Sequence, residues 1–466
     1  MKNKSKLKYY PLSAVQKSDL ILYAASFRHT QIANIPISIY VDEEIDVELM
    51  REAIRIEVQR NDSLRVKMSL RFFRLGQCFL PELDIGEIPF DDLSDKTDEE
   101  FTAYYKEQSY RPLAVFKGIS FRVRIFRAPN GRYGLLGTFC HVFHDAFDVG
   151  LFYRDTLKVY TALKNGLPLP PPLNNYEDTL QKDFALYKNK AHMKRVAGFY
   201  DRYFDTPTPS LYSGVDGMRE LTRVRTRWHA PKFRGVPIFH PFHDEALTVD
   251  CGLERELTDR MTAFCAERKV SLQSLFQLGI RTHLSKINEN TDDVSVLITV
   301  ARRCTKEDIN SGGSRALTHM MRTVLPDETT FGDALKAIDR CNLSLYKHSD
   351  YPFLREVLKQ GWYDKRIPWF TPMSLMLTFF PQELMGEDVG MKYEFFSRGS
   401  GYMHISSYVM IAPSLITGQY SCHHIYQPNI VKLEDVWLLH ENMIKIIDEG
   451  MKDPDIAIGK LRDRVL

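Results

Sequence analysis

The pattern of apolar and polar positions predicts a chain in which strands and helices alternate. Residues 35–41 are mostly apolar and β-branched, which is typical of a buried strand. Asp46 then precedes apolar residues at helical spacing, so we expect it to cap a helix over 47–60. An acidic run opens a second predicted helix, over about 98–108, because negative charge favours the N-terminus of a helix.

The clearest local signal is a β-hairpin that is followed at once by a helix. Residues 119–127 alternate in polarity, a Pro-Asn-Gly turn follows, and residues 132–140 return as a second strand. The segment HVFHDAFDVG comes directly after the return strand and leads into a predicted helix over 148–164. Titratable groups therefore collect where a strand gives way to a helix, a place where rigid elements can fix the geometry of a reactive site.

A Pro-rich stretch at 166–175 divides the chain, and we interpret it as a stiff surface connection. Beyond it we expect a helix over 176–204 and irregular segments over 205–240. The alternation then resumes, with strands predicted at 246–252, 294–300, 374–380, 404–411 and 416–421 and helices at 254–268, 271–287, 331–346 and 433–450. This order predicts an α/β (α+β) protein of two related lobes, formed by residues 1–175 and 176–466.

Composition and charge narrow the class of protein. Among 466 residues, 44% are hydrophobic and 26% are charged, which excludes a disordered or fibrous chain. The formal net charge of +2 argues against a broad nucleic-acid-binding face. No apolar run approaches the length of a membrane span, and the basic N-terminus lacks the apolar stretch of a signal peptide. Seven scattered cysteines without a C-x-x-C pair indicate neither a disulfide framework nor a zinc knuckle, so we expect a soluble, cytoplasmic protein.

Two overlapping H-x-x-x-D patterns fall in the segment after the hairpin, His141 with Asp145 and His144 with Asp148. A neutral imidazole can accept a proton from a reacting group, while a carboxylate four residues later can hold the loop through a salt bridge. The pattern is also typical of histidines that only pack in a core or lie on the surface. By itself it therefore does not identify a site.

Longer segments of the sequence, on both sides of this motif, are similar to the conserved segments of a known family. PLSAVQKSDLILY is similar to an opening LTxxQxxLW segment, AIRIEVQRNDSLRV to a helix ending in RHexLR, and FCHVFHDAFDVGLFYRDTLKVY to HHxxxDGxSxxxLLxELxxxY. VSLQSLFQLGIRTHLSKINENTDDVSVLITVARR is similar to TxxxxLxAAxxxxLxRxtGxxDvxxGtpxxxR. These are segments of the condensation domains of nonribosomal peptide synthetases, members of the chloramphenicol-acetyltransferase-like acyltransferase superfamily. The chain resembles them from Pro11 to Met451.

The flank of the motif selects one of the two His–Asp pairs. In the family that the chain resembles, the motif Asp lies nine residues before an Arg or similar polar residue, with an apolar triplet between them. Asp145 satisfies this spacing with Arg154, whereas Asp148 is three residues out of step. The resemblance therefore implies that His141 is the catalytic histidine and that Asp145 is the motif carboxylate.

The resemblance implies two chloramphenicol-acetyltransferase-like lobes that form a V-shaped pseudo-dimer around a central tunnel. His141 would lie near the middle of the tunnel as a base or positioning group. A thioester donor would enter from one face and an amine or alcohol from the other. Asp145 is expected to point away from the tunnel and to pair with Arg65, holding the loop. No bound cofactor or metal is implied, because the thioester co-substrate is acyl-coenzyme A or a phosphopantetheinyl carrier protein.

The main hypothesis is a freestanding acyltransferase that works with a separate acyl or peptidyl carrier protein, or with coenzyme A, and a small-molecule acceptor. Two departures from the family pattern, Cys140 for its first histidine and Ala146 for its glycine, keep other functions open. These are a catalytically silent docking module for a carrier protein and an O-acyltransferase of the wax-ester or alcohol-acetyltransferase kind. Neither a nucleic acid nor a membrane span enters any of these hypotheses.

Further motifs are interpreted without a catalytic role. We interpret residues 422–424 (Cys-His-His) as strand and loop residues rather than metal ligands, because no matched pair of ligands is visible in the sequence. Residues 311–314 (Ser-Gly-Gly-Ser) are expected to form a flexible loop, and residues 240–244 a Pro-bounded turn. Cys140 is expected to be a small wall residue beside the site rather than a nucleophile.

Overall fold

A computed structural model describes residues 7–71, 73–116, 118–204, 210–238, 244–352, 370–381, 384, 389–397 and 399–465. Of the turn expected at 240–244, only Asp244 lies within the described residues. Across these ranges, no helix is both long enough and apolar enough to cross a membrane.

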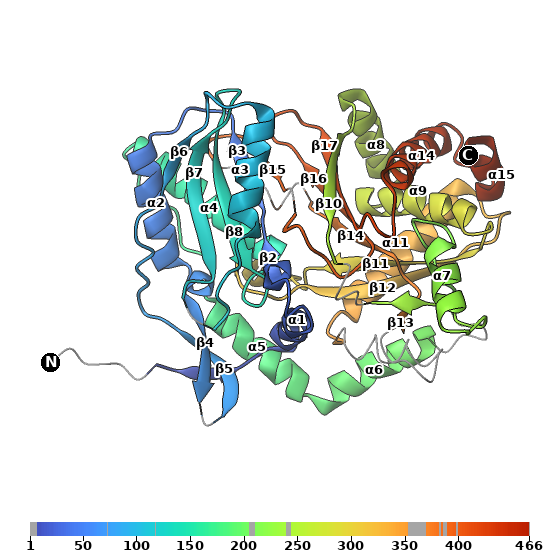
Figure 1. The fold of residues 1–466 in the computed structure, drawn as a ribbon, viewed down its shortest axis with the longest axis horizontal. Helices are drawn as coiled ribbons and strands as arrows, with labels where there is room; N and C mark the ends of the chain where they lie inside the picture. Colours follow the sequence, from blue (N-terminus) through green and yellow to red (C-terminus); the bar gives the residue numbers. More distant parts are fainter. Residues whose placement is uncertain are drawn as a thin grey trace.

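Two mixed sheets of six strands each form the two lobes (Figure 1). The first has the order β15-β3-β8-β7-β6, with β2 paired to β8, and comprises β2 (Asn34–Ile35), β3 (Ser38–Val41), β6 (Phe90–Asp92), β7 (Phe121–Arg127), β8 (Tyr133–Cys140) and β15 (Tyr393–Phe396). The second has the order β10-β17-β16-β14-β11-β12 and comprises β10 (Leu247–Gly252), β11 (Asp293–Val300), β12 (Leu317–Val324), β14 (Leu375–Phe379), β16 (Ser407–Pro413) and β17 (Tyr420–Tyr426). Most pairings are antiparallel, but β6–β7, β11–β14 and β14–β16 are parallel. This arrangement confirms the mixed α/β class and the two lobes.

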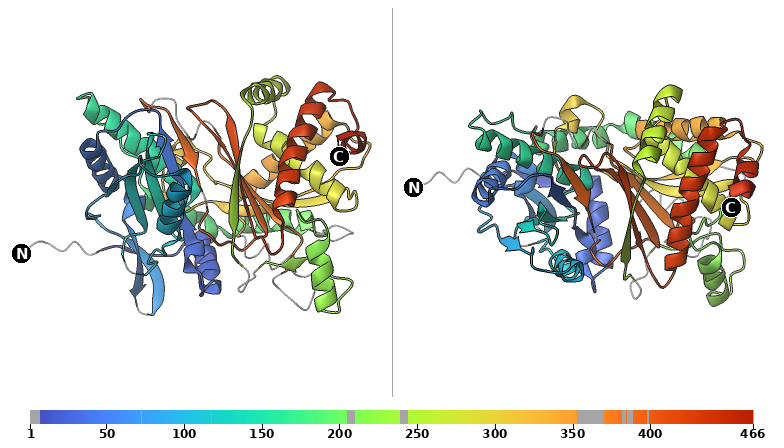
Figure 2. Two further views of the ribbon diagram at one scale, coloured as in Figure 1. Left: turned by 45° about the horizontal axis from the view of Figure 1, so that its top comes forward. Right: turned by 90° about the horizontal axis from the view of Figure 1, so that it is seen from above.

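Helices cover both sheets and connect the lobes. On the first sheet these are α2 (Val47–Arg60), α4 (Ala146–Lys164) and α3 (Asp98–Tyr110), and on the second α8 (Arg255–Arg268), α9 (Leu272–Ile287), α11 (Phe331–Lys347) and α14 (Leu433–Lys452). Helices α5 (Tyr176–Lys188) and α6 (Lys190–Phe204) run along one edge of the molecule from the first lobe to the second (Figure 1 and Figure 2). Each lobe therefore has its own apolar core between sheet and helices.

Smaller elements complete the fold. They are a three-stranded sheet of β1 (Tyr9–Pro11), β4 (Val66–Arg71) and β5 (Arg74–Phe79), the pair β9 (Val236–Pro237) and β13 (Phe370–Thr371), the 3-10 helices η1 (Thr30–Ala33) and η2 (Asp62–Arg65), and the helices α1 (Ala14–Ala25), α7 (Arg219–Arg227), α10 (Lys306–Ile309) and α15 (Ile458–Val465). The hairpin of β4 and β5 buries only Val66, Met68, Gln77 and Cys78. Its exposed residues include Leu70 and Leu75.

Local sequence explains the elements that lead to the site. Asp46 caps α2 as predicted, accepting a hydrogen bond from the Leu49 N–H, and α2 buries its apolar stripe at Met50, Ile54 and Val58. The hairpin of β7 and β8 forms as predicted, with Gly131 at φ 78° in the turn. The return strand β8 is buried along its whole length and delivers the following loop to the interior.

The helix predicted over 176–204 is two helices, because Asn189 ends α5 in an extended conformation. Its side-chain oxygen accepts the His192 N–H at 3.1 Å and so starts α6. A short amide side chain competes with the helical backbone for hydrogen bonds in this way, which is why asparagine favours helix ends over helix interiors.

The division of the chain at residue 175 stays a prediction, and one strand crosses it. Strand β15 comes from the second part of the sequence but pairs with β3 in the first sheet, with Phe395 opposite Ile39. Figure 1 shows β15 between β3 and β16. The first sheet is thus completed by the second part of the chain.

Candidate active site

A cavity of about 540 Å³ lies where the two lobes meet. Its wall includes residues of α1, β2 and the loop after β8 from the first lobe, and of β11, β14 and β16 from the second. Most of the lining side chains are apolar, among them Phe147, Leu297, Met376 and Phe380. Polar and charged side chains, including His141 and Asp19, interrupt this apolar wall.

Among the described residues, two histidines line this cavity, His404 before β16 and His141 of the loop after β8. His141 follows β8 directly, and its backbone N–H donates to the Ala33 carbonyl at 2.7 Å, which fixes the start of the loop. Its side chain is 46% exposed, and Nδ1 lies 3.6 Å from Oδ2 of Asp19. Desolvation of the ring lowers the pKa of His141, but the Asp19 carboxylate, with smaller contributions from the backbone and Asp145, leaves the pKa above its ordinary value.

Asp19 is a site residue that sequence reasoning missed. It lies on α1, whose N-terminus is closed by a capping box of Ser13 and Gln16. Its side chain is 15% exposed, and Oδ2 also accepts a hydrogen bond from the Ser314 hydroxyl at 3.4 Å. No local pattern marks Asp19, because α1 and β8 lie far apart in the sequence and meet only in the folded chain.

Asp145 is completely buried and does not pair with Arg65. It binds the two terminal nitrogens of Arg303 at 3.0 and 3.2 Å and accepts the backbone N–H groups of Arg315 and Ala316 at 2.8 and 2.9 Å. It also caps α4 by accepting the Asp148 N–H. Burial alone would raise the pKa of Asp145, but Arg303 and these N–H groups hold it below its usual range.

The expected ion pair between Asp145 and Arg65 is therefore wrong. Arg65 donates instead to the backbone carbonyls of Val58, Gln59 and Leu80, and so ties the end of α2 to the residue after β5. Arg303, in the segment that follows β11 of the second lobe, is the partner of Asp145 instead.

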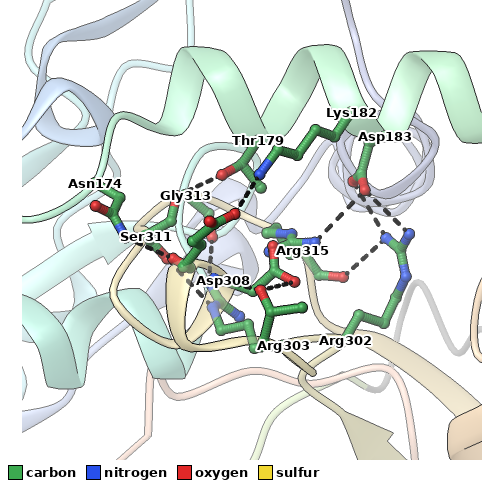
Figure 3. Close-up of polar contacts among 12 residues, drawn as sticks. Asn174, Thr179, Lys182, Asp183, Arg302, Arg303, Asp308, Ser311, Gly313 and Arg315 are labelled. Carbon is green, nitrogen blue, oxygen red and sulfur yellow. Dashed lines mark hydrogen bonds and ion pairs between the residues drawn. The ribbon is translucent and has the colours of Figure 1, made fainter.

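The segment 302–315 of the second lobe is held by a polar network against the crossing helix α5 (Figure 3). The Thr179 hydroxyl of α5 contacts the Ser311 hydroxyl at 2.8 Å, and Arg303 donates to the Gly313 carbonyl at 2.8 Å. Arg302 lies between Asp183 of α5 and Asp350. This network fixes the partner of Asp145 and hence the loop that carries His141.

The other histidine of the overlapping patterns is structural. His144 is completely buried, with Nδ1 at 2.6 Å from Asp148 and Nε2 at 2.8 Å from the Ser120 hydroxyl. Asp148 in turn accepts the Ser63 hydroxyl at 2.9 Å. Both ring nitrogens of His144 are thus occupied within the core, and His144 does not line the cavity.

The two departures from the family motif fit this geometry. Ala146 lines the cavity as the first residue of α4, and it is not among the residues with positive φ, so the backbone does not require glycine there. Cys140 is 1% exposed, and burial raises the pKa of its thiol to about 12. A thiol of that pKa stays protonated at neutral pH, which argues against a nucleophile. Cys140 is not among the residues that line the cavity and packs instead with Val142 and Phe143, so the expected wall position is wrong.

The flexible loop expected at 311–314 is instead a packed junction. Ser311 and Ser314 are buried, and Gly313 adopts φ 84°. A Cβ on Gly313 would lie 2.3 Å from the ring of Tyr176, and one on Gly312 would lie 2.3 Å from Oδ1 of Asp148. Glycine is needed here for close approach between the lobes, a reason that the short sequence motif does not reveal.

Among the described residues, one group of side chains lies close enough together to share a metal ion. It consists of Cys251, His424 and His440. It does not belong to the cavity wall. The interpretation of residues 422–424 as strand residues is correct for their secondary structure, because all three lie in β17.

Comparisons with known proteins agree with this architecture. The family model for the condensation domain matches residues 6–461. Surfactin synthase subunit 2 of Bacillus subtilis (strain 168) is 24% identical over 355 residues, which are 76% of this chain and 9% of the relative. Bacitracin synthase 1 of Bacillus licheniformis is 22% identical over 461 residues, which are 97% of this chain and 8% of the relative. The chain thus spans about a tenth of the length of these two relatives.

Solved structures share the fold over nearly the whole chain. The first condensation domain of the calcium-dependent antibiotic synthetase, in complex with a substrate analogue, has a TM-score of 0.78 at 15% identity and covers 97% of this chain and 99% of its own. A variant of the starter condensation domain of rhizomide synthetase RzmA, in complex with C8-CoA, has a TM-score of 0.77 at 16% identity and covers 97% of each chain. With its family model matched from end to end and its two-lobed fold shared with these structures, the chain belongs to the condensation-domain family.

Proposed function

We propose that this protein transfers an acyl group from a thioester to an amine or an alcohol, with His141 as the base or positioning group. The observation that carries the proposal is the His141 imidazole at the wall of the cavity between the lobes, paired with Asp19 through Nδ1. Membership of the condensation-domain family supports thioester-dependent acyl transfer, and the similar RzmA domain in complex with C8-CoA supports an acyl thioester as donor.

The chemistry follows from the position of the imidazole. The acceptor nitrogen or oxygen attacks the carbonyl carbon of the thioester, a new C–N or C–O bond forms, and the C–S bond breaks. The proton of the acceptor moves to Nε2 of His141, since Nδ1 faces Asp19, and then to the departing sulfur. A raised pKa makes His141 a stronger base once it is neutral.

Asp145 and Arg303 act as positioning residues in this scheme. Their ion pair is buried, and it joins the loop that carries His141 to the second lobe. A group that must meet a reacting atom needs such support, because small errors in placement reduce the rate steeply. The largely apolar wall would accommodate an acyl chain, and the donor sulfur would belong to coenzyme A or to the phosphopantetheine of a carrier protein.

The experiment is detection by mass spectrometry of free coenzyme A released from a panel of acyl-coenzyme A donors with mixed amine and alcohol acceptors. Wild type, His141→Ala and the control His229→Gln, an exposed histidine outside the cavity, are compared. We expect acceptor-dependent release in wild type and control, and at least about 100-fold less in His141→Ala. Release that is unchanged in His141→Ala contradicts the assignment.

Absence of release with every donor would reject coenzyme A as the donor. The same chain is then assayed with acyl groups loaded on a carrier protein. Binding of the carrier protein without transfer, equal in wild type and His141→Ala, would replace the proposal by the docking-module hypothesis.

A further inference from the structure

A second cluster of reactive side chains lies in the second lobe, on the opposite side of its sheet from the cavity. Cys251 of β10 and His424 of β17 are joined there by His440 of α14, and the three residues are 6%, 1% and 6% exposed. Along β17, Ile425 lines the cavity, so the alternation of the strand directs the neighbouring His424 to the other face, toward α14. The cluster is therefore separate from the candidate active site.

The register of the sheet brings the ligand atoms together. Cys251 lies directly opposite Cys422 in the ladder of β10 and β17, and His424 follows Cys422 by two residues, on the same face. One ligand atom each of Cys251, His424 and His440 lies within 4.8 Å of the others. Nε2 of His424 is 3.2 Å from Nδ1 of His440, close to the separation of about 3.3 Å that two imidazole ligands have on one tetrahedral zinc ion.

A single hydrogen bond joins the two imidazoles of the cluster, between Nε2 of His424 and Nδ1 of His440. A metal ion bound to these two nitrogens would replace that hydrogen bond with two metal–nitrogen bonds. Nδ1 of His424, on the other side of the ring, has no hydrogen-bond partner with or without such an ion.

We propose that Cys251, His424 and His440 form a structural zinc site that ties β10 and β17 to α14. Two imidazoles and a thiolate are ligands that zinc prefers over magnesium or calcium, and a buried site without access to the cavity favours a structural over a catalytic ion. Cys422 is the cross-strand neighbour of Cys251, but it is not in the group whose ligand atoms lie within 4.8 Å of one another, so the described residues provide three protein ligands. This inference does not depend on the proposed acyl transfer.

The test measures the metal content of the purified full chain, after loading with Zn²⁺ and dialysis, by inductively coupled plasma mass spectrometry. Cys251→Ser and His440→Gln are compared with matched controls in the same lobe, Cys265→Ser and His423→Gln. Cys265 is a buried cysteine outside the cluster, and His423 lies on the other face of β17, paired with Asp250. Cys422→Ser separates a four-ligand from a three-ligand site.

We expect about one equivalent of zinc in wild type and both controls, and its loss in Cys251→Ser and His440→Gln. In wild type, Co²⁺ should replace Zn²⁺ and give a thiolate-to-cobalt charge-transfer band, and a chelator should lower the melting temperature. Because the last two readouts use wild type alone, they decide the question even where a variant does not fold. Zinc that dialyses away from wild type, or a cobalt complex without the thiolate band, would overturn the proposal.

Discussion

At the scale of single residues, the site depends on two charged pairs that join segments far apart in the chain. Asp19 of α1 faces His141 and raises its pKa, and Arg303 of the second lobe neutralises Asp145. The first pair affects the reactivity of the imidazole, because a nearby carboxylate favours its protonated form. The second affects its position, because Asp145 caps the helix that follows the loop.

Asp19→Asn should lower the pKa of His141 and shift the acid limb of the pH–rate profile to lower pH, since the base is active only when neutral. Its activity at neutral pH should stay well above that of His141→Ala. The profile of kcat/KM against pH measures the effect. An acid limb at the same pH in wild type and Asp19→Asn would show that Asp19 does not act on His141.

The same variant should change stability in a pH-dependent way. A histidine whose pKa is raised by folding stabilises the fold at a pH below the pKa of the unfolded chain, and this contribution is lost as the pH rises through the folded pKa. Asp19→Asn should therefore be less stable than wild type mainly at acid pH. Urea unfolding at several pH values measures the difference in the free energy of unfolding.

Asp145→Asn should show strong energetic coupling to Arg303→Gln and little to Arg65→Gln. Removal of one partner from a buried ion pair costs about 3–5 kcal/mol, because the other charge is left unpaired in the core. Substitutions at residues without shared contacts change the free energy of unfolding additively, to within about 0.5 kcal/mol. Two double-mutant cycles by denaturant unfolding test this, and equal coupling in both cycles would contradict the Arg303 assignment.

At the scale of elements, the junction at 311–314 holds the lobes in register. It lies against α5 through the Thr179–Ser311 contact and against the first lobe through the tight approach of Gly312 to Asp148. The predicted helix over 176–204 breaks at Asn189, so α5 alone follows this junction. Short packed contacts thus set the alignment of the segment that carries Arg303.

Gly313→Ala should destabilise the protein by about 1–3 kcal/mol more than Gly131→Ala does. Both glycines have positive φ, 84° and 78°, so both substitutions carry the same kind of backbone strain. Only at Gly313 does the new Cβ meet another group, the Tyr176 ring at 2.3 Å, whereas Gly131 has open space around it. The free energies of unfolding of the two variants provide the comparison, and equal losses would argue against tight packing at the junction.

At the scale of the whole molecule, both lobes line the cavity, and the thiol of Cys304 gives a chemical means to probe it. The seven cysteines all lie in the described part of the chain, and Cys304 is the exposed one. It lines the cavity beside Arg303. A reagent that reaches Cys304 therefore enters the space in which we propose that the acyl donor binds.

A bulky maleimide should label Cys304 first and abolish acceptor-dependent release of coenzyme A, while Cys304→Ser should stay active and resist inhibition. Accessible thiols react faster than buried ones, because burial raises the pKa of a thiol. Burial raises the pKa of Cys265, for example, to about 12. Peptide mass spectrometry identifies the labelled residue, and the release assay measures activity. Full activity after complete labelling of Cys304 would place the reaction elsewhere.

Much of the fold and part of the site could be predicted from the sequence. Helix α2 with its Asp46 cap, the hairpin of β7 and β8, and the His141–Asp145 motif depend on neighbouring residues, whose periodicity and turn chemistry are local. The resemblance to condensation domains rests on the order of such local segments along the chain, and the family match confirms it. The sequence by itself thus determined the class, the family and the motif whose His141 lines the cavity.

Only the tertiary structure decided which distant groups meet. Asp145 pairs with Arg303 rather than Arg65, and Asp19 faces His141, although no spacing along the chain relates these residues. Likewise, β15 pairs with β3 in the first sheet, although the two strands are far apart along the chain. The physical reason is that a charged side chain or an unpaired strand edge can be satisfied by many partners of the right type. The packing of the two lobes selects one of these partners, and this selection is not encoded in any single segment.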